Sequence, residues 1–154
     1  MPALSVLCLC RCMMHGFNLV LGSVLSFPWA QRLVVSAQRV VTYFKASHRP
    51  LALLRDAAER NNINTGLRSA NKTRFTSKHD CIKSVLTNQP AFTILLQQHR
   101  NAITNADVVD ILEDHTFWAD LSQLDKVLAP LSKVIMAVQA NRSTLADVCR
   151  CVCS

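Results

Sequence analysis

The amino-acid sequence predicts an all-α protein, an irregular multi-helix bundle. Three observations favour this fold class. The 154 residues include only three glycines and five prolines, so few tight turns are expected. Apolar residues recur at three- and four-residue steps over much of the chain, which is the period of an amphipathic helix. Half of the residues are apolar, and a chain of this length can bury the core of one domain.

The first predicted helix spans residues 13–25 and belongs to a single helical domain, which we expect to cover residues 12–153. Its apolar positions at helical spacing are Phe17, Val20, Leu21, Val24 and Leu25. We expect this helix to be largely buried. Residues 1–11 contain no acidic residue and are expected to be an unstructured or misassigned start.

The second and third helices have recognisable starts. Ser26 is the predicted cap of the second helix, because its hydroxyl can accept a hydrogen bond from a backbone N–H. Pro28 is tolerated in the first turn, where the missing N–H has no helical partner. The apolar face of this helix consists of Leu33, Ala37, Val40, Val41 and Phe44. Pro50 opens a third, short helix that runs to Arg60.

A loop precedes the fourth helix. Residues 61–72 contain Asn-Asn, Thr-Gly and Ser-Ala-Asn and show no apolar periodicity, which predicts a loop. Ser77 and Asp80 stand three residues apart, as in a capping box. We therefore expect the fourth helix to start near Ser77.

The clearest periodic signal lies in the last third of the chain. Helix resumes over residues 91–98, and Thr104 with Asp107 predicts another box-like start. Apolar residues then recur at alternating four- and three-residue steps in a seam of Phe117, Leu121, Leu124, Leu128, Leu131, Ile135 and Val138. We expect the seam to pack within the chain, because it is too short for a separate coiled coil. Pro130 predicts a bend in this helix.

Charge divides the chain into two halves. The formal net charge is +7, and eleven basic against three acidic residues lie between Gln31 and Val85. Six acidic residues and one basic residue lie between Thr104 and Lys126. The domain therefore has a basic half, residues 28–86, and an acidic half that contains the seam, residues 104–153. A basic surface suits a polyanion such as DNA, and an ordinary solvated helix surface explains the surplus about as well.

The seven cysteines do not predict a metal site. They crowd into residues 8–12 and 149–153 around a single Cys81, whereas structural zinc sites use two well-separated ligand pairs. An odd number cannot pair fully within the chain, which favours reduced thiols in a nuclear or cytosolic compartment.

Apolar runs near the start raise the question of secretion or membrane insertion. No Lys or Arg precedes the first run, and no uninterrupted run reaches about 18 apolar residues. We expect no membrane partner, and a secreted protein is the second alternative for localisation.

Cationic and aromatic residues lead into the fourth helix. Lys72, Arg74 and Lys78 surround its expected start, where unpaired N–H groups and the positive helix end attract anions. Phe75 offers a ring face on which a base can stack. This combination predicts contacts with phosphate and an unpaired base, although an isolated phenylalanine is more often a core residue.

The segment Thr73-Arg74-Phe75-Thr76-Ser77 resembles the Thr-Arg-Trp-x-Ser segment of hAT-superfamily transposases, with Phe75 in place of tryptophan. Upstream, Cys12-Met-Met-His15 followed by Asn18-Leu19 resembles the Cys-x-x-His and Asn-Leu motif of that family. Three further segments resemble its helical region in the same order: Phe117-Trp118, Leu128-Ala-Pro130-Leu131 and Ser143-Thr-Leu-Ala-Asp147. The resemblance covers nearly the whole chain.

The resemblance implies the all-helical insertion domain that interrupts a ribonuclease-H-like catalytic fold. It implies that the family-motif residues are Cys12, His15, Arg74 and Phe75. His15 would donate to a phosphate oxygen near the scissile bond, and Phe75 would stack on an extruded base. The expected DNA-binding residues are His15, Lys72, Arg74, Phe75 and Lys78.

The same resemblance argues against catalysis by this chain. The family cleaves DNA with two metal ions such as Mg²⁺, held by a triad of carboxylates. The first acidic residue here is Asp56, and no segment resembling the triad is found, so we expect no cofactor and no enzymatic activity.

The expected function is therefore that of a truncated or relic hAT-like transposase fragment, a transposable-element product that binds DNA weakly in the nucleus without strand cleavage. A missing transposase core or a second copy of the chain are further possible partners. The alternative is a helical protein-protein interaction module that uses the seam at residues 117–138.

Overall fold

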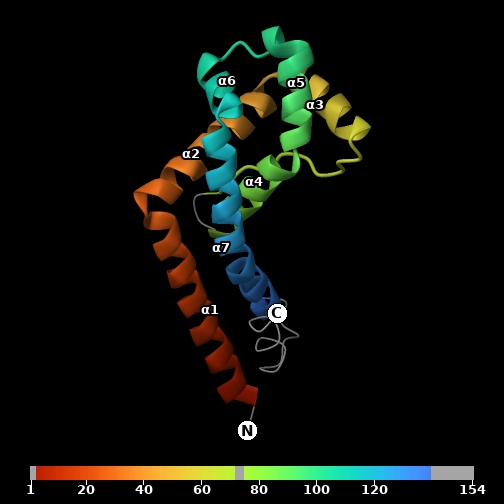
Figure 1. The fold of residues 1–154 in the computed structure, drawn as a ribbon. Helices are drawn as coiled ribbons and strands as arrows, with labels where there is room; N and C mark the ends of the chain where they lie inside the picture. The colour runs from red at the N-terminus through yellow and green to blue at the C-terminus, as the bar shows by residue number, and fades with distance from the viewer. Residues whose placement is uncertain (1–2, 72–74, 140–154) are drawn as a thin grey trace.

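The protein is all-helical in its computed structural model, which describes the backbone of residues 3–71 and 75–139 and the side chains of residues 15–71 and 76–137. No strand occurs in these residues, and the all-α prediction is confirmed. The elements, shown in Figure 1, are α1 (Ala3–Ser26), α2 (Pro28–Ala46), α3 (His48–Arg60), α4 (Phe75–Thr87), α5 (Gln89–His99), the 3₁₀ helix η1 (Arg100–Ala102), α6 (Ala106–Glu113) and α7 (His115–Gln139).

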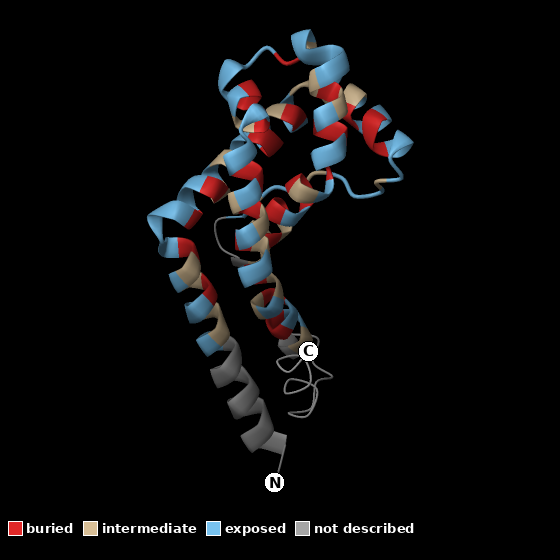
Figure 2. Ribbon diagram, in the orientation of Figure 1, coloured by how far each residue is buried: buried red, intermediate tan, exposed pale blue. Residues whose placement is uncertain are grey.

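Helix α7 organises the bundle, because it contacts α1, α2, α4 and α6 (Figure 1). Helix α3 packs instead on α5, at the side of the bundle away from α1. Buried residues concentrate where α2, α4, α5 and α7 meet (Figure 2). The largest fully buried side chains include Phe44, Phe92, Leu121, Leu124, Leu128 and Ile135.

The first helix differs from its prediction in two ways. Helix α1 begins at Ala3, so most of residues 1–11 are helical where an unstructured or misassigned start was expected. The helix is also less buried than expected, since Leu19 and Val20 are 57% and 49% exposed. Only one side of α1 lies against α2 and α7, and that side carries the buried Leu21 and Leu25.

Helix α2 follows after a sharp bend of 86° and confirms most of its prediction. Its five predicted face residues are all buried, and Pro28 lies in the first turn. Ser26 does not cap the helix, because its hydroxyl donates to the carbonyl of Ser23 at 2.6 Å. Phe27 occupies the cap position without a side-chain hydrogen bond.

The described part of the predicted loop, residues 61–71, is non-helical as expected. The capping box at the next helix is wrong, because α4 already begins at Phe75. The Ser77 hydroxyl accepts from the Asn71 N–H at 2.8 Å and lies 3.2 Å from the Asn71 carbonyl, to which it donates. Ser77 therefore fastens the end of the loop to the first turn of α4.

The predicted cap of α6 is displaced by one residue. Asn105, and not Thr104, is the cap, and its Oδ1 accepts from the Val108 N–H at 3.3 Å. The backbone N–H of Thr104 donates to the Tyr43 hydroxyl at 2.9 Å. An asparagine cap serves as well as threonine, so sequence spacing alone did not decide between them.

The seam prediction is confirmed over the described side chains. Phe117, Leu121, Leu124, Leu128 and Ile135 are buried, and Leu131 is half-buried. Helix α7 continues through Pro130, and the expected bend there stays a prediction. The side chain of Val138 and the expected last helix from Thr144 lie outside the described residues.

Candidate nucleic-acid interface

The structure locates two of the five predicted DNA-binding side chains. His15 is exposed on α1, and Lys78 is half-buried in the first turn of α4. Lys72 and Arg74 lie outside the described residues, as do the side chains of Phe75 and of the family-motif residue Cys12.

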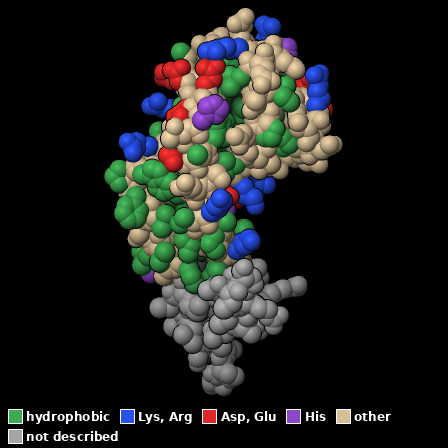
Figure 3. All heavy atoms as spheres, in the orientation of Figure 1, with side chains coloured by type: hydrophobic (Ala, Val, Ile, Leu, Met, Phe, Trp, Pro, Cys, Tyr) green, Lys and Arg blue, Asp and Glu red, His purple; other side chains and the backbone are tan. Residues whose placement is uncertain are grey.

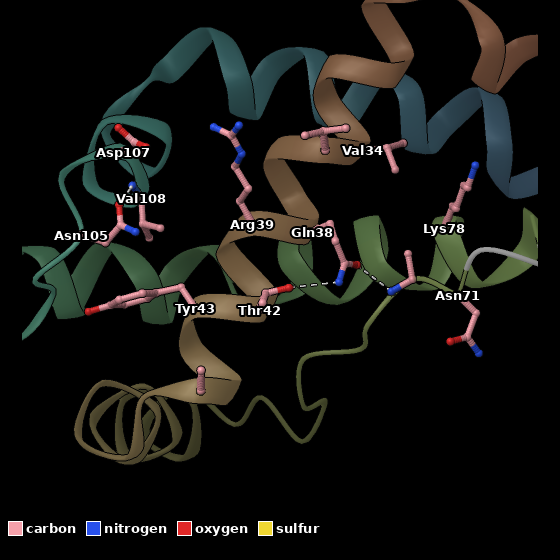
Figure 4. A pocket seen from close by; sticks show the side chains of 13 residues that line it. Val34, Gln38, Arg39, Thr42, Tyr43, Asn71, Lys78, Asn105, Asp107 and Val108 are labelled. Atoms are coloured by element: carbon pink, nitrogen blue, oxygen red, sulfur yellow. Dashed lines mark hydrogen bonds between the residues drawn. The ribbon is translucent and has the colours of Figure 1, made fainter.

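A groove of about 650 Å³ lies beside the predicted segment, between α2, the end of the loop, α4 and α6 (Figure 4). Asn71 and Lys78 line it, and they stand on either side of residues 72–75 in the sequence. His15 does not line the groove, so the structure does not bring the two located residues together there.

Apolar, polar and charged side chains all line the groove. Its apolar residues are Val34, Val35, Ala46, Ala70 and Val108. Its polar residues are Gln38, Thr42, Tyr43, Asn71 and Asn105, and its charged residues are Arg39, Lys78 and Asp107. Polar and charged residues therefore outnumber the apolar residues in the lining of the groove.

Gln38 holds the α2 and loop sides of the groove together. Its Oε1 accepts from the Ala70 N–H at 2.8 Å and from the Cys81 thiol at 3.6 Å. Its Nε2 donates to the Thr42 hydroxyl at 3.1 Å (Figure 4). One amide therefore connects α2 with the loop and with α4, and its own orientation is fixed by three contacts.

Tyr43 holds the α6 end of the groove. Its hydroxyl accepts from the Thr104 N–H at 2.9 Å and lies 3.3 Å from the Thr104 hydroxyl. These contacts place Asn105 and Asp107 opposite α2 (Figure 4). Tyr43 and Thr104 are 61 positions apart in the sequence, which explains why sequence spacing did not reveal the groove.

Charge is distributed unevenly along the groove. Lys78 lies at the end near Asn71, Asp107 lies at the α6 end, and Arg39 projects from α2 between them (Figure 4). Arg39 is exposed and forms no salt bridge with any described residue. The two cations therefore lie apart, with Lys78 at the loop end of the groove and Arg39 on the Asp107 side (Figure 4).

The basic surface continues along α2. Arg32 and Arg39 line a shallower hollow of about 570 Å³ beside the groove, together with Val35 and Ser36. The two arginines are seven residues apart and therefore lie on the same helix face, opposite the buried one. This spacing was the available sequence signal for Arg39, which was not among the predicted binding residues.

Cys81 lies behind the groove and is fully buried. Burial raises the pKa of its thiol from 9.0 to about 11, while the Ala70 N–H and the charge of Lys45 act in the opposite direction. The thiol is therefore protonated at neutral pH and acts as a hydrogen-bond donor to Gln38. It has the environment of a structural cysteine, and not of a nucleophile.

His79 follows Lys78 and points into the bundle. It is buried, and its Nε2 lies 2.9 Å from Oδ1 of Asp125 on α7. The pair ties α4 to α7 and so holds the first turn of α4 in place.

No group of three or more His, Cys, Asp or Glu residues in the described part of the chain could hold a metal ion. No single helix in the described residues is long and apolar enough to cross a membrane. Residues 15–26 and α2 reach that length and apolar composition only when they are taken together, and an 86° bend separates them.

No protein-family model, curated protein or solved structure matches the chain.

Proposed function

We propose that the chain is a hAT-like transposase fragment, truncated or relic, that binds DNA weakly in the nucleus and does not cleave it. The family assignment rests on the sequence motifs around His15 and Arg74. DNA binding is supported by one structural observation above all: Arg39 and Lys78 line a groove that adjoins the segment predicted to contact DNA. An all-helical fold is compatible with both.

The mechanism is recognition without chemistry. Arginine and lysine side chains neutralise phosphates and release counterions, which supplies affinity without sequence preference. Arg32 and Arg39 on α2 add to the contacts expected of Lys72, Arg74 and Lys78.

Salt dependence of DNA binding tests this proposal. A fluorescently labelled branched duplex should bind, and its affinity should fall steeply with salt. Three neutralised phosphates would lower the affinity by roughly 40-fold between 50 and 200 mM monovalent salt, as measured by fluorescence anisotropy. Absence of binding at 50 mM salt, or an affinity that does not change with salt, would contradict the proposal.

A protein-interaction function is the second candidate, and it needs a different surface from the one predicted. The seam at residues 117–138 is buried inside the bundle wherever its side chains are described, apart from the half-buried Leu131, so it offers a partner little surface. Exposed apolar residues gather instead on α1 and the start of α2 (Figure 3). The most exposed are Leu19, Val20, Phe27 and Val35, which we call the α1–α2 corner. This corner favours self-association, because exposed apolar patches mark interaction sites.

A further inference from the structure

We infer that the bend between α1 and α2 binds an anionic phospholipid surface, with Phe27 and Trp29 among the headgroups and Arg32 and Arg39 facing lipid phosphates. This inference goes beyond DNA binding and does not depend on the family assignment. It departs from the expectation of no membrane partner, which concerned secretion and spanning helices. A protein that lies on the surface of a bilayer needs neither.

Large apolar side chains are exposed at the bend, which lies at the outer edge of the molecule (Figures 1 and 3). Phe27 and Trp29 stand on either side of Pro28, and Leu19 and Val20 continue the exposed apolar surface along α1. Aromatic rings are favoured at the boundary between water and lipid, and tryptophan above all, because its ring is apolar and its N–H is polar. The bend therefore has the side chains of an interfacial anchor.

The charges next to these rings are positive. Helices α1 and α2 contain no Asp or Glu, since the first acidic residue of the chain is Asp56. The hollow of about 570 Å³ that begins at Pro28 is lined by Arg32 and Arg39 and by no acidic residue. Neither arginine forms a salt bridge with a described residue. Such a surface attracts the phosphates of anionic lipids.

The combination of rings and cations decides between partners. Val35 is exposed and stands between Arg32 and Arg39 on one face of α2, so apolar and cationic side chains share this face. DNA would pair with the arginines and leave the apolar side chains in water. A second copy would cover the apolar side chains, but it would bring the arginines of both copies together. An anionic lipid surface accounts for both kinds of side chain.

Binding of the full chain to vesicles tests this inference. Vesicles of phosphatidylcholine mixed with phosphatidylserine should carry the chain with them in sedimentation, and vesicles of phosphatidylcholine alone should carry much less. Added salt should weaken the binding to the mixed vesicles, because it screens exposed charges.

Fluorescence reports whether the bend itself enters the lipid. The chain has two tryptophans, and Trp118 is buried with its Nε1 donating to the Leu112 carbonyl at 2.9 Å. Trp29 is 36% exposed, so binding should shift its emission to shorter wavelength, and brominated lipids should quench it. Trp29→Phe should still bind the mixed vesicles and should lose the shift.

Phe27→Ser tests the apolar contact without adding a charge that the vesicles would repel. Folding should be preserved, because Phe27 occupies the cap position of α2 and serine is favoured there. Binding to the mixed vesicles should weaken by about tenfold, as expected for loss of a buried phenylalanine. Val127→Ser is the matched control, since Val127 is an exposed apolar residue of α7 outside the bend, and it should bind like the parent.

Arg32→Gln tests the cationic contact. It should weaken binding to the mixed vesicles by about fivefold, which corresponds to the usual contribution of one arginine near an anionic surface. Arg49→Gln removes the same charge from an exposed position of α3, at the side of the bundle away from α1, and it should bind like the parent.

Equal binding to the two kinds of vesicle, or equal losses in Phe27→Ser and Val127→Ser, would overturn the inference. A chain that associates with itself through the bend and does not bind vesicles would also overturn it. Phe27→Ser removes no cation and should bind DNA like the parent. DNA binding without vesicle binding would overturn the inference alone, and vesicle binding without DNA binding would support it and overturn the proposed function.

Discussion

At the scale of single residues, the groove depends on side chains whose contacts span long sequence separations. Gln38 reaches Ala70 and Cys81, 32 and 43 residues away. No local motif marks such a glutamine, and a polar residue on a mostly apolar helix is predicted to be exposed to solvent. Lys78 was among the predicted binding residues because it stands at a helix start, which is a local signal. Gln38, Arg39 and Asp107 were not, because their proximity is a product of the fold.

The buried thiol of Cys81 gives a prediction about pH. Its pKa is about 11 in the folded protein and 9.0 when unperturbed. Below pH 9 the thiol is therefore protonated in both the folded and the unfolded chain, and it adds no pH dependence to the free energy of unfolding. Between pH 9 and 11 the unfolded chain loses the proton first, and the free energy of unfolding falls by about 2 kcal/mol. Urea unfolding at pH 8 and pH 10.5 measures the loss.

Cys81→Ala is the control for that measurement. The difference between parent and variant isolates the thiol, because all other titratable groups are common to both proteins. The parent should lose more stability than the variant between the two pH values. Equal losses would mean that the thiol is not shielded from water.

At the scale of elements, periodicity predicted the interior better than the boundaries. The apolar face of α2 and the described part of the α7 seam are confirmed, because burial on one side of a helix imposes the repeat. The starts of α2, α4 and α6 were each misplaced or capped by a different residue. Serine, threonine and asparagine compete for cap positions within a few tenths of a kcal/mol, so neighbouring candidates are not separated by sequence.

The attachment of α4 to α7 gives a prediction at this scale. Asp125→Ala removes the partner of the buried His79, and leaving a buried polar group without its partner should cost about 1–3 kcal/mol of stability. Gln123→Ala changes an exposed residue of the same helix and should cost less than 0.5 kcal/mol. Chemical denaturation of both variants provides the comparison.

A double-mutant cycle with His79→Ala decides whether the two side chains act together. If they do, the double variant should be more stable than the sum of the single losses implies. Additive losses would show that the 2.9 Å contact contributes nothing of its own to the stability of the bundle.

At the scale of the whole molecule, the largest departure from prediction is the exposure of α1. Residues 13–25 have an apolar composition that favours burial on more than one side, yet Leu19 and Val20 stay exposed although α2, α4 and α7 contact this helix. Composition predicts that apolar surface will be covered, but it does not say by what. Whether a neighbouring helix exists to cover it depends on the arrangement of the entire bundle.

The α1–α2 corner therefore gives the last prediction, which concerns association. Phe27 is 62% exposed, and Phe27→Asp introduces a charge that is costly to bury in an interface. If a second copy covers the corner, the parent should show a mass above 17.1 kDa that rises with concentration in light scattering, and the variant should remain at 17.1 kDa. Val127→Asp alters an apolar residue of α7 that is 48% exposed and outside the corner, and it should associate like the parent. A monomeric parent at all concentrations, or equal loss of association in both variants, would show that this corner does not bind a second copy of the chain.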